Sequence, residues 1–221
     1  QIELRLLAHF SGCKELIEAY REGKDIHALT ASQVFSVPID QVSSSQRRAA
    51  KAVNFGIIYG ISDFGLASNL NISAKQAGEY IRKYFETYSD VKKYMDSNVE
   101  FARKNGYVTT LLGRKRVINE IKSSNYNIRS FGERAAMNMP LQGSSADIIK
   151  IAMLRIFARM KKEGLRSKLI LQVHDELVID AYEDEADRVG ELLRFEMENA
   201  VQLNVPLVAE VHRGKNWYEA K

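Results

Sequence analysis

The stretch LILQVHDELVID (residues 169–180) decides the fold, because it is typical of two strands joined at a charged tip. Two mostly apolar runs flank three consecutive polar residues, which are His174, Asp175 and Glu176. Apolar runs of this length are typical of buried strands. We therefore expect an antiparallel strand pair over 168–173 and 177–181, with buried flanks on either side of the tip.

Helical patterns precede this strand pair. We expect helices over about 44–59, 74–87, 90–105 and 127–139, then a long one from Ser144 or Ser145 to Gly164, with a hairpin over 107–118. The boundary signals are possible caps, glycines and a proline, namely Ser43 with Gln46, Ser73, Ser89, Gly60, Gly106, Pro140 and Gly143. Pro140 and Gly143 are expected to separate the last two helices.

Further elements flank this region. Residues 2–10 alternate at first like the end of a strand and then continue as a helix. After the strand pair, we expect a helix over about 183–200 and a last strand over 207–212. This order predicts an α+β fold, with a small antiparallel sheet flanked by helices, rather than βαβ winding.

Composition bounds the class of protein. The chain has 221 residues, 45% of them hydrophobic, which suffices for one large domain or two modest ones. Its single cysteine, Cys13, excludes an internal disulfide and fits a reducing compartment. No apolar run approaches the ~20 residues that span a bilayer. Because the chain lacks an initiator Met, we expect it to be a fragment of a longer protein.

Charge is unevenly distributed. Residues 101–134 carry eight basic and two acidic residues, whereas residues 182–199 carry seven acids and two arginines. A basic middle beside an acidic flank favours a polyanion that docks on one side. Two solvated faces are the alternative.

Four residues in the predicted helix 44–59 form a slanting ridge, because each is four positions from the next: Arg47, Lys51, Phe55 and Tyr59. Two cations followed by two aromatic rings match the order of groups in a nucleoside triphosphate, whose phosphates attract Arg and Lys and whose base stacks on rings. The alternative is an ordinary amphipathic helix with core aromatics. Gly56 and Gly60 weaken a helix, which makes sense if something passes close to the backbone or if the helix moves.

The acidic tip at 174–176 suggests Mg²⁺, which prefers hard oxygen ligands. Adjacent strand residues point to opposite faces, so we expect Asp175 to be a direct ligand and Glu176 to act behind it. A two-metal site needs a further carboxylate from elsewhere to bridge ions ~4 Å apart. A polar hairpin turn is one alternative. A phosphohydrolase-type His-Asp metal pair is another, although the four histidines are scattered.

Three long motifs together resemble the family A DNA polymerases. QVHDELV is similar to motif C of that family, RRAAKAVNFGIIYG to motif B, and QIELRLLAHFS to motif A without its first three residues. GKDIHALTA and ERAAMNMPLQGSSADIIK also match, so the resemblance covers the whole chain. It implies a metal-bridging motif A aspartate three positions before Gln1, and a chain that is inactive alone.

The resemblance implies a role for each candidate residue. For catalysis and metal binding, it implies Asp175 as the metal ligand, Glu176 behind it, and Lys51 as proton donor to the leaving pyrophosphate. For the nucleotide, it implies contacts from Arg47, Lys51, Phe55, Tyr59, His27, Glu3 and Gln1, with Glu3 excluding a ribose 2′-hydroxyl. For DNA, it implies His174 at the primer end and Arg134, Asn138 and Gln142 along the duplex. Any of these could instead be structural; Glu3 could be a plain surface acid.

The resemblance also implies an organisation and an activity. Residues 1–24 and 127–221 would belong to the palm and 25–126 to the fingers. The enzyme would add deoxynucleotides to the 3′ end of a primer by two-metal phosphoryl transfer with Mg²⁺. It would be a cytoplasmic monomer that binds primer-template DNA and does not bind a membrane. The rivals are a nucleic-acid-binding fragment without activity and a metal-dependent phosphohydrolase that uses His174 and Asp175.

Overall fold

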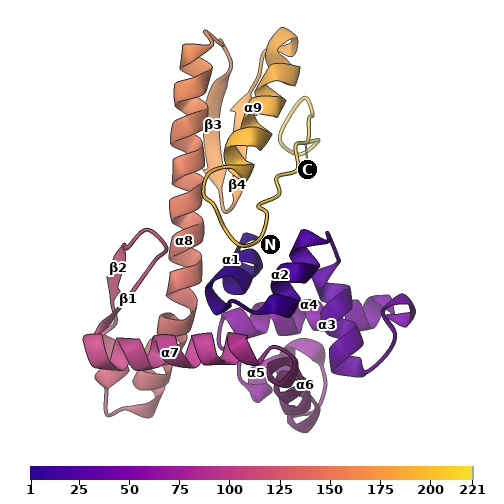
Figure 1. Ribbon diagram of the computed structural model, residues 1–221, viewed down its shortest axis with the longest axis vertical. Coiled ribbons are helices and arrows are strands. Elements are labelled where there is room, and N and C mark those ends of the chain that lie inside the picture. The colour runs from indigo at the N-terminus through magenta and orange to yellow at the C-terminus, as the bar shows by residue number, and fades with distance from the viewer. Residues whose placement is uncertain (221) are drawn as a thin grey trace. The chain divides into compact units, whose positions relative to one another are not determined.

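The computed structural model describes residues 1–220, which form helices and two separate two-stranded antiparallel sheets (Figure 1). The chain divides into two compact units, and the boundary falls between Ser144 and Ser145. Each unit has its own buried apolar residues. The predicted α+β class is confirmed, and the subdomain boundaries at 24 and 126 remain a prediction.

The first unit is built mainly from helices. Its elements in order are α1 (Ile2–Ser11), α2 (Lys14–Arg21), α3 (Ile26–Phe35), η1 (Ile39–Gln41), α4 (Ser44–Ile58), α5 (Asp63–Leu70), α6 (Ala74–Thr87), α7 (Ser89–Asn105), β1 (Tyr107–Thr109), β2 (Lys115–Val117), η2 (Asn119–Lys122) and the start of α8 (Tyr126–Lys162). Helix α3 packs along α4, and α5 along α6. The predicted hairpin is confirmed, since β1 and β2 pair from Tyr107↔Val117 to Thr109↔Lys115.

Capping explains where several of these helices begin. Ser43 and Gln46 form the predicted capping box of α4, and Ser73 forms an equivalent box with Gln76 at α6. The predicted cap at Ser89 is wrong, because Tyr88 is the N-cap of α7 and makes no side-chain cap hydrogen bond. The C-terminal end of α7 is as predicted, with Gly106 in the left-handed region at φ 79°.

The first residues form helix α1 throughout, so the predicted strand end is wrong. The buried residues include Leu4, Leu7 and Ala8, which are three and four positions apart and lie on one helix face. The helical period therefore dominates over the alternation that begins at Ile2.

Helix α8 runs without interruption through Pro140, so the break predicted at 140–143 is wrong. Ser144 is not a helix cap. Its hydroxyl donates to the Pro140 carbonyl at 2.5 Å and accepts from the Leu111 amide at 2.8 Å, which ties the helix to the loop of the β1–β2 hairpin. A Cβ at Gly143 would lie 2.5 Å from Thr110 Cγ2, so this glycine permits close packing rather than a break.

The second unit contains the rest of α8, then β3 (Lys168–Val173), β4 (Glu176–Asp180), η3 (Glu183–Glu185) and α9 (Ala186–Glu198). Arg159 of α8 donates to Glu196 of α9 at 2.8 Å. The strand pair is confirmed, but the predicted strand at 207–212 does not form. Within residues 1–220, β3 and β4 pair only with each other, so residues 207–212 have no ladder partner. Across the described helices, none combines the length and apolarity needed to cross a bilayer.

Candidate functional site

The predicted ridge lies on the exposed face of α4. Arg47 and Lys51 are exposed, Phe55 is half-buried, and Tyr59, the C-cap residue, is 44% exposed. The opposite face, including Ala50, Val53 and Ile57, is buried. The ridge is therefore accessible to a ligand, and Tyr59 is not part of the core.

Asp25 connects the cationic end of the ridge to α3. Its carboxylate caps α3 by accepting from the backbone amides of His27 at 2.9 Å and Ala28 at 3.2 Å. Arg47 Nε donates to the same carboxylate at 2.6 Å. Partial burial raises the pKa of Asp25, but these hydrogen bonds outweigh it and hold the pKa below its usual value. Arg47 is thus fixed beside the start of α3.

His27 lies behind the ridge and is 5% exposed. Its ring centroid is 5.9 Å from that of Phe55, and its Nδ1 is 3.0 Å from Asn54 Nδ2. Burial lowers the pKa of His27; the Asp25 carboxylate opposes this shift, and the Arg47 and Lys51 charges reinforce it. These surroundings therefore favour the neutral imidazole.

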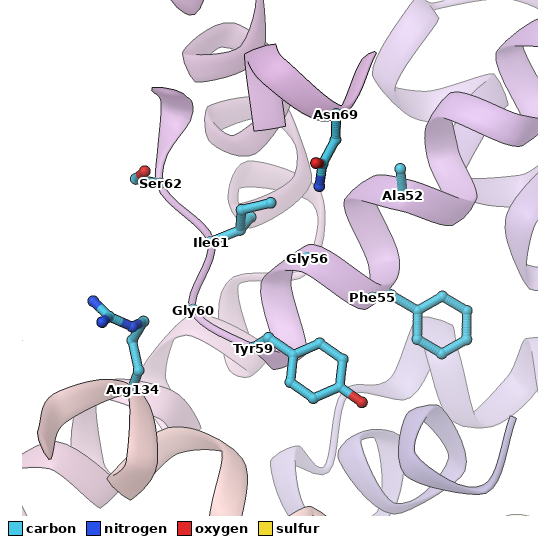
Figure 2. Close-up of a pocket in the computed structure, with 9 residues that line it drawn as sticks. All are labelled: Ala52, Phe55, Gly56, Tyr59, Gly60, Ile61, Ser62, Asn69 and Arg134. Carbon is cyan, nitrogen blue, oxygen red and sulfur yellow. The ribbon is translucent and has the colours of Figure 1, made fainter. Parts of the chain in front are cut away.

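A pocket of about 520 Å³ adjoins the aromatic end of the ridge (Figure 2). Its walls come from α4, the turn after it, α5 and α8, and its lining residues are Ala52, Phe55, Gly56, Tyr59, Gly60, Ile61, Ser62, Asn69 and Arg134. A Cβ at Gly56 would lie 2.7 Å from Ile61 Cγ2. What passes close to this glycine backbone is thus the chain itself as it turns away from α4.

Three residues of α8, spaced by four, face the end of α4. A Cβ at Gly60 would lie 2.9 Å from Arg134 Cγ. Asn138 Nδ2 donates to the Ile58 carbonyl at 3.4 Å. Burial and the Glu3 carboxylate raise the pKa of Tyr59 above its usual value, and a hydrogen bond between Gln142 and the Tyr59 hydroxyl partly opposes this shift. The structure therefore gathers Arg134, Asn138 and Gln142 beside the end of α4, and of the three only Arg134 lines the pocket.

Glu3 joins the same group from α1. Tyr59 Oη donates to Glu3 Oε2 at 3.1 Å, which places the carboxylate at the aromatic end of the ridge. Gln1 is exposed and is the N-cap residue of α1, where its side chain makes no cap hydrogen bond. Its predicted nucleotide contact remains a prediction.

The acidic tip belongs to the second unit. His174 and Asp175 form a two-residue turn, His174 in the left-handed region at φ 52°, and Glu176 begins β4 opposite Val173. All three side chains of the tip are exposed. The predicted burial of the flanks is wrong for β3, where Ile170 is 60% exposed, because its face has no covering element among the described residues.

The carboxylates of the tip have the donor type that Mg²⁺ prefers, but they are too few to hold it. Among residues 1–220, no three His, Cys, Asp or Glu side chains cluster as a possible metal site. The described part of the chain therefore supplies at most part of a coordination sphere. A His-Asp metal centre built from several histidines does not form there either.

Three residues of the site were missed from sequence: Asp25, Thr30 and Asn54. Asp25 carries a detectable signal, because an Asp directly before a helical pattern is a typical N-cap. Thr30 donates to Asn54 Oδ1 at 3.1 Å across the buried α3–α4 contact. The pairing of residues 24 positions apart leaves no local pattern to find.

Comparison with known proteins identifies the family of this chain. The family model for DNA polymerase family A matches residues 1–219. The chain is 57% identical to the DNA polymerase I of Caldicellulosiruptor bescii and 54% identical to that of Bacillus caldotenax, over 221 residues in each case. These alignments cover 100% of this chain but only 26% and 25% of the relatives, so the chain spans about a quarter of their length.

A solved structure has the same fold. It is described as the POL domain of Pol1 from M. smegmatis in complex with DNA primer-template and dNTP, and it matches with a TM-score of 0.95 and 46% sequence identity. The match covers 100% of this chain and 39% of that one. The family model matches nearly the whole chain, the relatives match all of it, and the chain belongs to DNA polymerase family A.

Proposed function

We propose that this chain supplies the nucleotide-binding and DNA-binding parts of a template-directed DNA polymerase, which adds deoxynucleotides to a primer 3′ end. The observation that carries the proposal is the exposed α4 ridge, with two cations at one end and two rings beside a pocket at the other. The solved relative with primer-template DNA and dNTP supports the same partners.

The α4 ridge would hold the incoming nucleotide along its length. Arg47, fixed by Asp25, and Lys51 would bind the triphosphate, because both side chains are exposed cations one helical turn apart. Phe55 and Tyr59 would pack on the sugar and base. Lys51 would also donate a proton to the leaving pyrophosphate, which stabilises charge that develops in the transition state.

Glu3 would select the sugar. Tyr59 holds the Glu3 carboxylate at the aromatic end of the ridge, where the sugar would lie. A ribose 2′-hydroxyl there would meet a bulky anion, whereas a deoxyribose would not. Gln1 would contribute a further nucleotide contact beside Glu3.

Four residues would contact primer-template DNA. Arg134, Asn138 and Gln142 share one side of α8, and such side chains can reach minor-groove acceptors that every base pair offers. His174 is exposed on its turn and would contact the primer end. Contacts of this kind check base-pair shape without selecting a sequence.

Asp175 would be a direct ligand of Mg²⁺, and Glu176 would act through groups around the metal rather than bind it directly. Groups other than the described residues would complete the coordination sphere of the metal. When bound in a two-metal arrangement, Mg²⁺ neutralises phosphate charge and activates the primer hydroxyl.

We further propose that residues 1–24 and 127–221 form the palm and that residues 25–126 form the fingers. The enzyme would act as a monomer in the cytoplasm, where the single thiol of Cys13 stays reduced.

The test uses a chimera in which this chain replaces the matching 25% of the DNA polymerase I of Geobacillus stearothermophilus, which is 53% identical to it. Asp175→Ala should abolish primer extension while primer-template affinity persists. Lys51→Ala should lower kcat/KM for dNTP about 10²-fold with little change in DNA affinity, because it removes a charge that acts on the transition state.

Lys75→Ala is the matched control, since Lys75 is an exposed lysine that lies on α6 and is not part of the ridge. It should extend primers like the unmodified chimera. Normal extension by both the Asp175 and Lys51 variants would contradict the proposal. Release of inorganic phosphate from dNTP without any primer would instead favour a phosphohydrolase.

A further inference from the structure

Three polar side chains form a line through the buried contact between α3 and α4. Thr30 is 0% exposed, Asn54 1% and His27 5%. Thr30 Oγ1 donates to Asn54 Oδ1 at 3.1 Å, and Asn54 Nδ2 lies 3.0 Å from His27 Nδ1. Buried polar groups that satisfy one another in this way hold their orientations firmly.

The orientation of the Asn54 amide in the structure points to one of the two imidazole nitrogens as the proton carrier. An amide nitrogen can only donate a hydrogen bond, and an amide oxygen can only accept one. In the orientation that the structure gives the Asn54 amide, its oxygen accepts from Thr30 and its NH₂ group is turned toward His27. His27 Nδ1 must therefore accept with its lone pair, and the proton of the neutral ring lies on Nε2.

The charges around His27 favour the neutral ring. Arg47 and Lys51 face it from α4, Asp25 faces it from the start of α3, and in the isolated 221-residue chain the amino group of Gln1 faces it as well. Burial and the three cations outweigh the single carboxylate, so the pKa lies below its usual value. With Nδ1 occupied by Asn54, Nε2 is the nitrogen left for a ligand.

We propose that Asn54 is a positioning residue that keeps His27 in the tautomer with its proton on Nε2, so that Nε2–H donates to a triphosphate oxygen, and that Thr30 holds the Asn54 amide in the required orientation. The inference rests on the proposed function for the identity of the acceptor. The opposite tautomer would present a lone pair to the phosphate and repel it. A neutral donor also keeps the contact constant as pH changes near neutrality.

The tautomer can be observed directly in the 221-residue chain with ¹⁵N-labelled histidine, because the chain has only four histidines. His27→Gln identifies the signals of His27. At pH above neutrality, Nδ1 should be unprotonated and Nε2 protonated. Nε2 should respond to added dATP, whereas Nδ1 should respond less. A proton on Nδ1 in the unmodified chain would overturn the inference without any variant.

Variants test the cause. Asn54→Asp replaces the donor by an acceptor, so the proton should move to Nδ1 and the pKa of His27 should rise. Thr30→Val removes the hydrogen bond that orients the Asn54 amide, so the preference of His27 for one tautomer should weaken. Thr30→Ser keeps the hydroxyl and should keep the preference of the unmodified chain. An unchanged tautomer in folded Asn54→Asp would show that Asn54 does not set it.

The pH profile of dATP affinity separates positioning from packing. The Kd of the unmodified chain should stay nearly constant above neutrality. In Asn54→Asp, His27 donates from Nε2 only while doubly protonated, so the Kd should rise about tenfold as pH increases through the raised pKa. Adding His27→Ala should remove this pH dependence, and its persistence would overturn the inference.

The two proposals fail in different ways. If the spectra show the expected tautomers but His27→Ala leaves the Kd for dATP unchanged, His27 does not contact the phosphate. The proposal that the tautomer serves to bind the triphosphate would then be wrong. Primer extension by the chimera would still support the remaining proposed function. If the chimera does not extend primers but the tautomers follow Asn54, the polymerase proposal fails and the positioning of His27 by Asn54 stands.

Discussion

At the scale of single residues, Gly60 allows the end of α4 to approach α8. Gly60 has φ 64°, and a Cβ there would lie 2.9 Å from Arg134 Cγ and 3.0 Å from Met137 Cε. An alanine would therefore suffer both left-handed strain and a clash. We expect Gly60→Ala to lower the free energy of unfolding by about 2–3 kcal/mol, measured by urea denaturation of the 221-residue chain.

Gly106→Ala is the matched control. Gly106 also has a positive φ, 79°, but a Cβ there would meet nothing within 4 Å. Only the backbone strain should appear, about 1 kcal/mol. Equal losses for the two variants would mean that Gly60 makes no tight contact with α8.

Residue-scale prediction succeeded where the signal was local. The ridge of Arg47, Lys51 and Phe55 follows from helix periodicity alone, and the structure places it on an exposed face. Asn54 belongs to the same helix but was missed, because its importance comes from Thr30 and His27 on another helix. A buried hydrogen bond between distant positions leaves no trace in spacing.

At the scale of elements, two serines with similar sequence signals behave differently. Ser73 caps α6, where it accepts from the Gln76 amide at 3.3 Å. Ser89 is the first residue of α7, whose N-cap is Tyr88. We expect Ser73→Ala to lower the free energy of unfolding by about 1 kcal/mol and Ser89→Ala to change it by less than about 0.5 kcal/mol. Chemical denaturation of both variants checks this, and a larger loss from Ser89→Ala would place the helix start elsewhere.

The elements that were wrongly predicted from the sequence are those whose formation depends on tertiary contacts. Pro140 normally ends a helix, yet α8 continues, because Ser144 and Gly143 pack it onto the loop of the β1–β2 hairpin. Residues 207–212 have the pattern of a strand, but a strand needs a ladder partner. Capping boxes and the two hairpins were predictable, because their determinants lie within a few residues of one another.

At the scale of the whole molecule, the two charged segments differ in how far they are neutralised. Most acids of the segment 182–199 form ion pairs with arginines of the second unit, through Arg159, Arg166, Arg188 and Arg213. In the basic segment 101–134, Arg103 pairs with Glu133, whereas Lys104, Arg116 and Lys122 are exposed. The basic segment is therefore the stronger candidate for contact with a polyanion, and this contact remains a prediction.

Salt dependence of DNA binding tests that assignment. Each phosphate contact by a basic side chain releases condensed counterions, so log K falls with log salt by about 0.9 per contact. The double variant Arg116→Ala/Lys122→Ala should weaken primer-template binding and reduce this slope by about one to two, measured by fluorescence anisotropy across a KCl series. Arg194→Ala, an exposed arginine inside the acidic segment, is the control and should leave the slope unchanged. An unchanged slope in the double variant, or an equal change in the control, would mean that Arg116 and Lys122 do not contact DNA.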